Sequence, residues 1–308
     1  MRVRVFDFDS SVTAQSRLLR RFRPEVLDLR QWGPRVRLGC RWSKFYRLER
    51  RIDRLIECDG SPVISLLGSD HYHHLSLALL RRLRHPFNLL VLDSRLDWYR
   101  GSPILHSRTW VKDAAQLPNV RRVFHVGARM SDSFITRWLS PSELVKSGKI
   151  VVLPASMPAG CDLASKPLRA DARTALDYHA LEEVLWPYLG DLDRFPLYVS
   201  LDKSVLWMPE SVTNSAAGEL QLDELKEVLQ FFLKGSGEDL LGMDIVGDWS
   251  PAASEGILNF WLGRLGTAPG QVEPDQARLC NEHTNLALLR FLAPAPANAA
   301  PFCRHRAA

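Results

Sequence analysis

Short apolar runs alternate with amphipathic stretches along most of this chain. Several of these runs are nearly continuous, which is typical of strands buried on both faces of a parallel sheet. The predicted strands are residues 2–8, 61–67, 88–92, 120–126, 150–153, 196–201 and 240–246. The stretches between and after them predict helices at residues 74–83, 107–117, 131–139, 141–146, 171–189, 221–233, 251–262 and 281–292. This alternation predicts an α/β fold with a doubly wound, mainly parallel sheet.

The predicted elements contain no internal repeat and no segment with the composition of a linker. We therefore expect one domain over residues 1–292. Residues 293–308, APAPANAAPFCRHRAA, are rich in alanine and proline and are expected to be disordered. The loops at residues 98–105 and 154–170 match no pattern that would identify a substrate.

Composition adds limits on the class of protein. Hydrophobic residues make up 46% of the 308 positions and charged residues 24%, as in a globular protein with a large core. No apolar run is long enough for a membrane span, and Asp7 and Asp9 fall where a signal peptide needs apolar residues. The five scattered cysteines include no CxxC pair, which indicates reduced thiols. We expect a cytoplasmic protein that does not act on membranes.

The net charge of +5 is spread unevenly. Residues 17–54 contain thirteen lysine or arginine residues and four acidic ones. Apolar side chains are interleaved with them, which predicts amphipathic helices folded against the domain rather than a free basic arm. The first interpretation of this segment is a solvated helical face or a subunit contact in a homo-oligomer. Nucleic-acid binding is the less favoured alternative.

Polar residues gather directly after four of the predicted strands. These residues are Asp70 and His71, then Asp93, Arg95 and Asp97, then Asp202 and Ser204, then Asp248. The carboxyl ends of parallel strands lie at one edge of the sheet, so these groups are expected to meet in one crevice. Carboxylates with an imidazole suit a divalent ion such as manganese or zinc. Taken singly, each residue is equally compatible with a turn or a helix cap.

Three of these clusters resemble the motifs of a known family. The segments GSDH at 68–71, DSRLD at 93–97 and SLDKS at 200–204 are similar in order and spacing to GGDH, DAHxD and SxDxD of the ureohydrolases. That family includes arginase, agmatinase and formimidoylglutamase. Further similarities lie at His106 and at residues 126–129, 213–225 and 243–251, so the resemblance spans residues 61–292. It implies a three-layer α/β/α fold, manganese, and hydrolysis of a carbon–nitrogen bond in a guanidinium or amidine group.

Carried over by position, the resemblance implies one complete metal site and one incomplete one. His71, Asp93, Asp97 and Asp202 match the protein ligands of one manganese ion. The second ion of the family needs a histidine and an aspartate at the positions of Arg95 and Ser204. A guanidinium cannot give up its proton to bind a metal. We therefore expect one ion, manganese or another divalent metal such as zinc, with Arg95 against Asp93 or Asp202.

The resemblance also implies roles in catalysis. Asp97 would orient a metal-bound hydroxide, and His106 would carry the proton to the leaving amine. Asp248 and Arg95 would contact the substrate, either a small guanidinium-bearing molecule or an arginine-containing peptide.

Two other readings of the chain are considered. One is a ureohydrolase-like binding or scaffold protein without catalysis. The other rests on the segment DFDSSVT at 7–13, which is similar to the phosphatase motif of the haloacid dehalogenase family. That family's later lysine and paired-aspartate motifs are not evident in this sequence, so the phosphatase reading is the weaker of the two.

Overall fold

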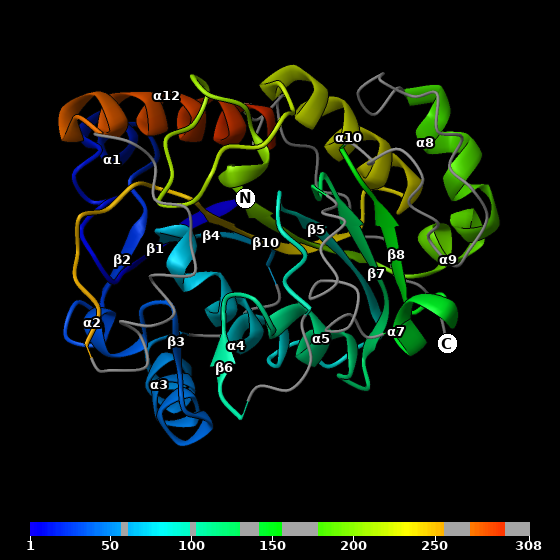
Figure 1. Ribbon diagram of the computed structural model, residues 1–308, viewed down its shortest axis with the longest axis horizontal. Coiled ribbons are helices and arrows are strands. Elements are labelled where there is room, and N and C mark those ends of the chain that lie inside the picture. The colour runs from blue at the N-terminus through cyan, green and yellow to red at the C-terminus, as the bar shows by residue number, and fades with distance from the viewer. Residues whose placement is uncertain (57–60, 99–102, 130–141, 156–177, 256–271, 293–308) are drawn as a thin grey trace.

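An eight-stranded parallel sheet runs through the centre of the computed structural model (Figure 1). The structure describes residues 1–56, 61–98, 103–129, 142–155, 178–255 and 272–292. The strands of the sheet, in chain order, are β1 (Arg2–Asp7), β2 (Glu25–Asp28), β4 (Val63–Gly68), β5 (Phe87–Leu92), β7 (Val120–Val126), β8 (Ile150–Leu153), β9 (Leu197–Asp202) and β10 (Leu240–Val246). Their order across the sheet is β2-β1-β4-β10-β9-β5-β7-β8, and each adjacent pair is parallel.

All seven strands predicted from the apolar runs are present in this sheet. The strand that the pattern did not predict is β2, at one edge. Its sequence is EVLD, and only Leu27 of its four residues is buried. An edge strand with one buried side chain gives no apolar run, so its pattern does not differ from that of a loop.

Helices cover both faces of the sheet and form two separate apolar cores, as Figure 1 and the packing clusters agree. One layer holds α2 (Gly33–Val36), α3 (Trp42–Leu55), α4 (Ser76–Leu80), α5 (Trp110–Ala115) and α7 (Ser142–Lys146). The opposite layer holds α1 (Ser16–Phe22), α8 (Tyr178–Leu185), α9 (Leu189–Arg194), α10 (Leu222–Gly235) and α12 (Pro274–Leu292). The three-layer α/β/α fold class is therefore confirmed.

The basic segment is folded against the domain, as its interleaved apolar residues predict. It forms α1, β2, α2, the short strand β3 (Gly39–Cys40) and α3. Leu18 of α1 is fully buried, and so are Phe45 and Leu48 of α3. Strand β3 pairs antiparallel with β6 (Leu105–His106), which ties the segment to the loop beyond β5.

The order of the central strands brings the predicted site together. The chain passes from β4 to β5 across two positions that β9 and β10 fill later, so β4, β10, β9 and β5 are neighbours. These are the four strands whose ends carry the polar clusters. Strands β5, β7 and β8 follow one another in one direction across the sheet, and β9 and β10 then follow in the opposite direction, so the winding reverses between β5 and β9. Open α/β sheets form their binding crevices at such a reversal.

Short helices begin where two of these strands end. The 3-10 helix η1 (Asp70–Leu75) follows β4 directly, and the Ser69 side chain accepts a hydrogen bond from the backbone N–H of His71 at its start. Another, η3 (Lys203–Val205), follows β9, and η2 (Trp186–Tyr188) links α8 to α9. The sequence instead predicts a loop at 68–71, followed by a helix from residue 74.

Several expectations fall partly or wholly outside the described residues. These are the helices at 131–139, 171–189 and 251–262, the loops at 98–105 and 154–170, and the tail at 293–308. Within the described residues, none of the helices combines the length and the apolar character needed to cross a bilayer. The single domain over residues 1–292 stays a prediction, and limited proteolysis that released two separately folded halves would contradict it.

Candidate metal centre

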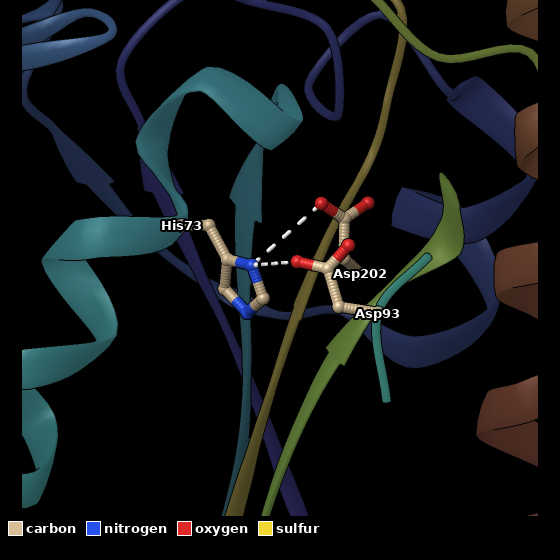
Figure 2. A group of neighbouring side chains, drawn as sticks. All are labelled: His73, Asp93 and Asp202. Atoms are coloured by element: carbon tan, nitrogen blue, oxygen red, sulfur yellow. Dashed lines mark hydrogen bonds and ion pairs between the residues drawn. The ribbon is translucent and has the colours of Figure 1, made fainter. Parts of the chain in front are cut away.

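A buried imidazole lies among three carboxylates at the carboxyl ends of β5 and β9. The Nδ1 atom of His73 is 3.0 Å from Oδ2 of Asp93 and 3.6 Å from Oδ2 of Asp202 (Figure 2). It is also 3.6 Å from Oδ2 of Asp97. None of these four side chains is exposed to solvent. The fold brings the three aspartates together as the sequence predicts, but the histidine beside them is His73 rather than His71.

The geometry of η1 explains why the histidine differs. A 3-10 helix has three residues per turn, so positions i and i+3 eclipse each other. Asp70 and His73 therefore lie on the same side of η1, and His71 lies about a third of a turn away. The family motif assigns the metal ligand to His71, directly after Asp70. In this structure the histidine in the cluster is His73, which lies one full 3-10 turn after Asp70. The three-residue spacing of Asp70 and His73 in DHYH would predict that they share a side, but only if the turn were already known to be 3-10.

His71 lies beside the cluster and not in it. Its Nδ1 atom has no hydrogen-bond partner within the described part of the chain. Burial lowers the pKa of His71 to about 4; the charge of Asp70 opposes this shift, and the charges of Arg37 and Arg95 add to it. His71 is therefore a neutral, partly exposed imidazole next to the cluster.

Arg95 occupies the position that the sequence assigns to it. Its Nη2 atom is 3.0 Å from Oδ2 of Asp202, and its Nη1 atom is 3.4 Å from Oδ2 of Asp70. Its Nε atom is 3.8 Å from Oδ1 of Asp93 and 3.9 Å from Oδ1 of Asp97. One guanidinium thus contacts four buried carboxylates while its own side chain keeps 21% exposure.

Two serines add hydrogen bonds to this cluster. The Ser204 hydroxyl donates to Oδ1 of Asp93 at 3.1 Å. Ser215 accepts a hydrogen bond from Arg95 and donates one to Asp70. The segment at 213–218 is therefore fastened to the cluster through Arg95 and Asp70.

The electrostatics of the cluster favour an added cation. Burial raises the pKa of Asp202 to about 7, and the charge of Asp93 adds to this shift although Arg95 opposes it. Burial would lower the pKa of His73, but its hydrogen bonds to Asp93 and Asp97 and the charges of Asp93 and Asp202 outweigh burial and raise the pKa to about 10. His73 is therefore protonated at neutral pH in this arrangement. A metal ion bound here would replace that proton.

The donor atoms fit a divalent ion. The Nδ1 atom of His73 and one oxygen each of Asp93 and Asp202 all lie within 4.8 Å of one another. Ligand atoms about 2.1 Å from a zinc or octahedral ion are separated from each other by roughly 3 to 3.4 Å. The distances of 3.0 to 3.6 Å from His73 to the carboxylates are close to that range. In addition, Oδ1 of Asp97 has no hydrogen-bond partner within the described residues.

A buried polar chain holds the other side of the His73 ring. Its Nε2 atom lies 3.0 Å from the Ser200 hydroxyl, and that hydroxyl donates to Oδ1 of Asp244 at 2.8 Å. Ser76 donates to the same oxygen at 2.7 Å. This arrangement lets Nε2 carry the proton and leaves Nδ1 free for a metal. Sequence reasoning missed these residues, although Ser200 and Asp244 interrupt otherwise apolar strands and face each other in register.

We expect Ser200→Ala to weaken metal binding by about 10–100-fold without unfolding the protein, because the ring loses the partner that fixes its tautomer. Titration of the metal-free protein against a competing chelator measures the affinity. Ser65→Ala is the matched control, since Ser65 is also a buried strand serine and faces Asp244 from β4. Equal affinities in the two variants would show that Ser200 does not position His73.

Two other predicted site residues are engaged elsewhere. The Asp248 carboxylate is 1% exposed and accepts hydrogen bonds from Lys203 at 2.9 Å and from Gln15 at 2.6 Å. Asn285 of α12 donates to it at 3.1 Å. This carboxylate is neutralised by the fully buried Lys203, so the structure does not support the prediction that Asp248 binds the substrate.

His106 lies in β6, where it pairs with Gly39 of β3. Its Nδ1 atom accepts a hydrogen bond from the backbone N–H of Arg108 at 3.1 Å. Burial lowers its pKa to about 4, and the charges of Arg108 and Lys112 add to this shift. None of these contacts is to a residue of the carboxylate cluster, so they give no support for His106 as the proton carrier.

Comparison with known proteins supports the fold. No family model matches the chain. An uncharacterized protein of Thermotoga maritima is 24% identical over 198 residues, which are 64% of this chain and 60% of that relative, so the chain matches less than two thirds of its length.

Three solved structures match over nearly the whole length of both chains. Arginase from Bacillus subtilis is 12% identical, with 94% of this chain and 98% of that chain covered and a TM-score of 0.52. Arginase from Bacillus cereus is 13% identical, with 97% and 100% covered and a TM-score of 0.52. A putative agmatinase from Clostridium difficile is 13% identical, with 94% and 95% covered and a TM-score of 0.50. This chain therefore has the arginase-like fold of the ureohydrolases.

Proposed function

We propose that this protein is a metal-dependent hydrolase that cleaves a carbon–nitrogen bond in a guanidinium or amidine group. The observation that carries the proposal is the contact of His73 with three buried carboxylates at the centre of an arginase-like sheet. Arg95 and a proton on His73 compensate these carboxylates in the metal-free protein, and a divalent ion would replace that proton. Burying so many ionisable groups is costly, so the cluster is not expected from packing alone.

One divalent ion, manganese or zinc, would be held by His73, Asp93, Asp97 and Asp202. A bound ion of this kind lowers the pKa of a coordinated water so that hydroxide forms near neutral pH. The ligand set has three carboxylates, and their charge is balanced by one divalent ion together with the Arg95 guanidinium. Arg95 also contacts Asp70, whose charge lies outside this balance. One ion per chain rather than two is supported by Arg95 and Ser204, which stand where a second ion would need ligands.

The remaining residues would orient the water and the substrate. Oδ1 of Asp97 would accept a hydrogen bond from the attacking water, since it has no hydrogen-bond partner within the described residues. His71 is a neutral, partly exposed imidazole beside Asp70 and Arg95, so it would hydrogen-bond to the substrate or to water at the edge of the cluster. The substrate would be a small guanidinium-bearing molecule or an arginine in a peptide.

The test combines metal content with turnover. Protein purified with added manganese or zinc is expected to hold about one ion per chain, measured by elemental analysis. Assays with arginine, agmatine and arginine-containing peptides would then detect urea or ammonia release. One ion together with turnover supports the hydrolase. An ion-binding protein without turnover on any guanidinium substrate would favour the alternative, a binding or scaffold protein with the same fold.

A further inference from the structure

Helix α3 presents a stripe of arginines on the face opposite its buried side. Arg47, Arg50 and Arg54 are spaced by three and four residues, so they recur on successive turns of one face. All three are exposed, whereas Phe45 and Leu48 on the other side are fully buried. In Figure 1, α3 lies at the lower left edge of the molecule, to the left of α4 in the same layer.

The acidic residues of α3 do not neutralise this stripe. Glu49 is paired with Arg81 at 2.6 Å, and Asp53 is paired with Arg82. Both partners come from the end of α4 and the turn after it, so the two carboxylates are bound on the side of α3 that faces α4. Within the described part of the chain, no carboxylate forms an ion pair with Arg47, Arg50 or Arg54, and Arg51 borders the stripe as a further exposed arginine.

An exposed aromatic ring lies at the border of the stripe. Tyr46 is 40% exposed and lies on an open surface together with Ser43, Arg47, Glu49 and Arg50. The guanidinium of Arg81 is 5.4 Å from the centroid of its ring. Proteins that bind single-stranded nucleic acids combine a positive track for the backbone with aromatic rings on which bases stack.

We propose that this face of α3 binds single-stranded nucleic acid, with Arg47, Arg50 and Arg54 on phosphates and Tyr46 stacked on a base. Guanidinium groups bind phosphate oxygens in a bidentate way, which favours arginine over lysine for this role. All three charged residues of the stripe are arginines, and none is a lysine. It offers no exposed aliphatic side chain that would enter a membrane. This binding is separate from the metal centre.

The test is the fluorescence anisotropy of a labelled single-stranded RNA of about 20 nucleotides, titrated with the full chain at several salt concentrations. Three phosphate contacts predict a slope of log affinity against log salt of roughly −2. Replacing Arg47, Arg50 and Arg54 with glutamate is expected to reduce affinity at least about 100-fold and to abolish the salt dependence. Tyr46→Ala is expected to lose about tenfold with an unchanged slope, and Tyr46→Phe to bind normally.

The control replaces Arg17, Arg20 and Arg21, which are exposed on or beside α1, with glutamate and so changes the net charge equally. This variant should bind like the natural protein, and circular dichroism should show both triple variants folded. An equal loss in the control would show a non-specific charge effect and overturn the proposal. Competition by polyglutamate as strong as by unlabelled RNA would overturn it in favour of an acidic polypeptide. No binding at low salt would also overturn it.

Discussion

Asp202→Asn is expected to remove both the bound metal ion and any hydrolysis. Its Oδ2 atom is 3.6 Å from Nδ1 of His73 and 3.0 Å from Nη2 of Arg95, so it takes part in both halves of the cluster. An amide is uncharged, and its NH₂ group cannot accept a hydrogen bond from the guanidinium. The loss should exceed the 10–100-fold that is typical when an outer partner of a metal ligand is removed. Elemental analysis and the guanidinium assays measure the two effects.

The matched control for this substitution is Asp28→Asn. Asp28 is the last residue of β2, and its side chain is 61% exposed. The same chemical change there should leave metal content and activity as they are in the natural chain. Thermal unfolding of both variants tests that each is folded. A folded Asp202→Asn protein that still held a full equivalent of metal would show that the ion binds elsewhere.

The sheet could be predicted from the sequence because its strands are buried on both faces. Strand β5, FNLLVL, has no exposed residue, so its apolar run stands out without any knowledge of its neighbours. The same feature places Asp93 directly after the run and hence at the carboxyl edge. Strand β2 lacks this signal, since three of its four residues are exposed.

The aspartates of the site could be predicted for the same reason. The histidine of the cluster and the buried pairing of Asp248 could not. The choice between His71 and His73 depends on whether the first turn after β4 is 3-10, which the hydrophobic pattern does not record. The pairing of Asp248 with Lys203 joins residues 45 positions apart and depends on how β9 and β10 lie side by side. The position of His106 similarly depends on its pairing with Gly39 of β3, which lies far from it in the sequence.

Arg95 links these observations to the number of metal ions. A guanidinium that contacts Asp70, Asp93, Asp97 and Asp202 supplies the positive charge that a second ion would bring. Four buried carboxylates without it would repel one another and raise one another's pKa. Its removal alone therefore leaves an uncompensated cluster, whereas its exchange for a metal ligand allows a metal ion to restore the charge.

Arg95→His combined with Ser204→Asp is accordingly expected to bind two divalent ions per chain. Ser204 already lies at 3.1 Å from Oδ1 of Asp93, so a carboxylate at position 204 and an imidazole at position 95 would both reach the space that the guanidinium fills. Elemental analysis and calorimetric titration with manganese count the ions. Ser204→Asp alone should keep one ion, because Arg95 still occupies that space and pairs with the new carboxylate. A folded double variant that still bound a single ion would show that Arg95 does not stand in for the second metal.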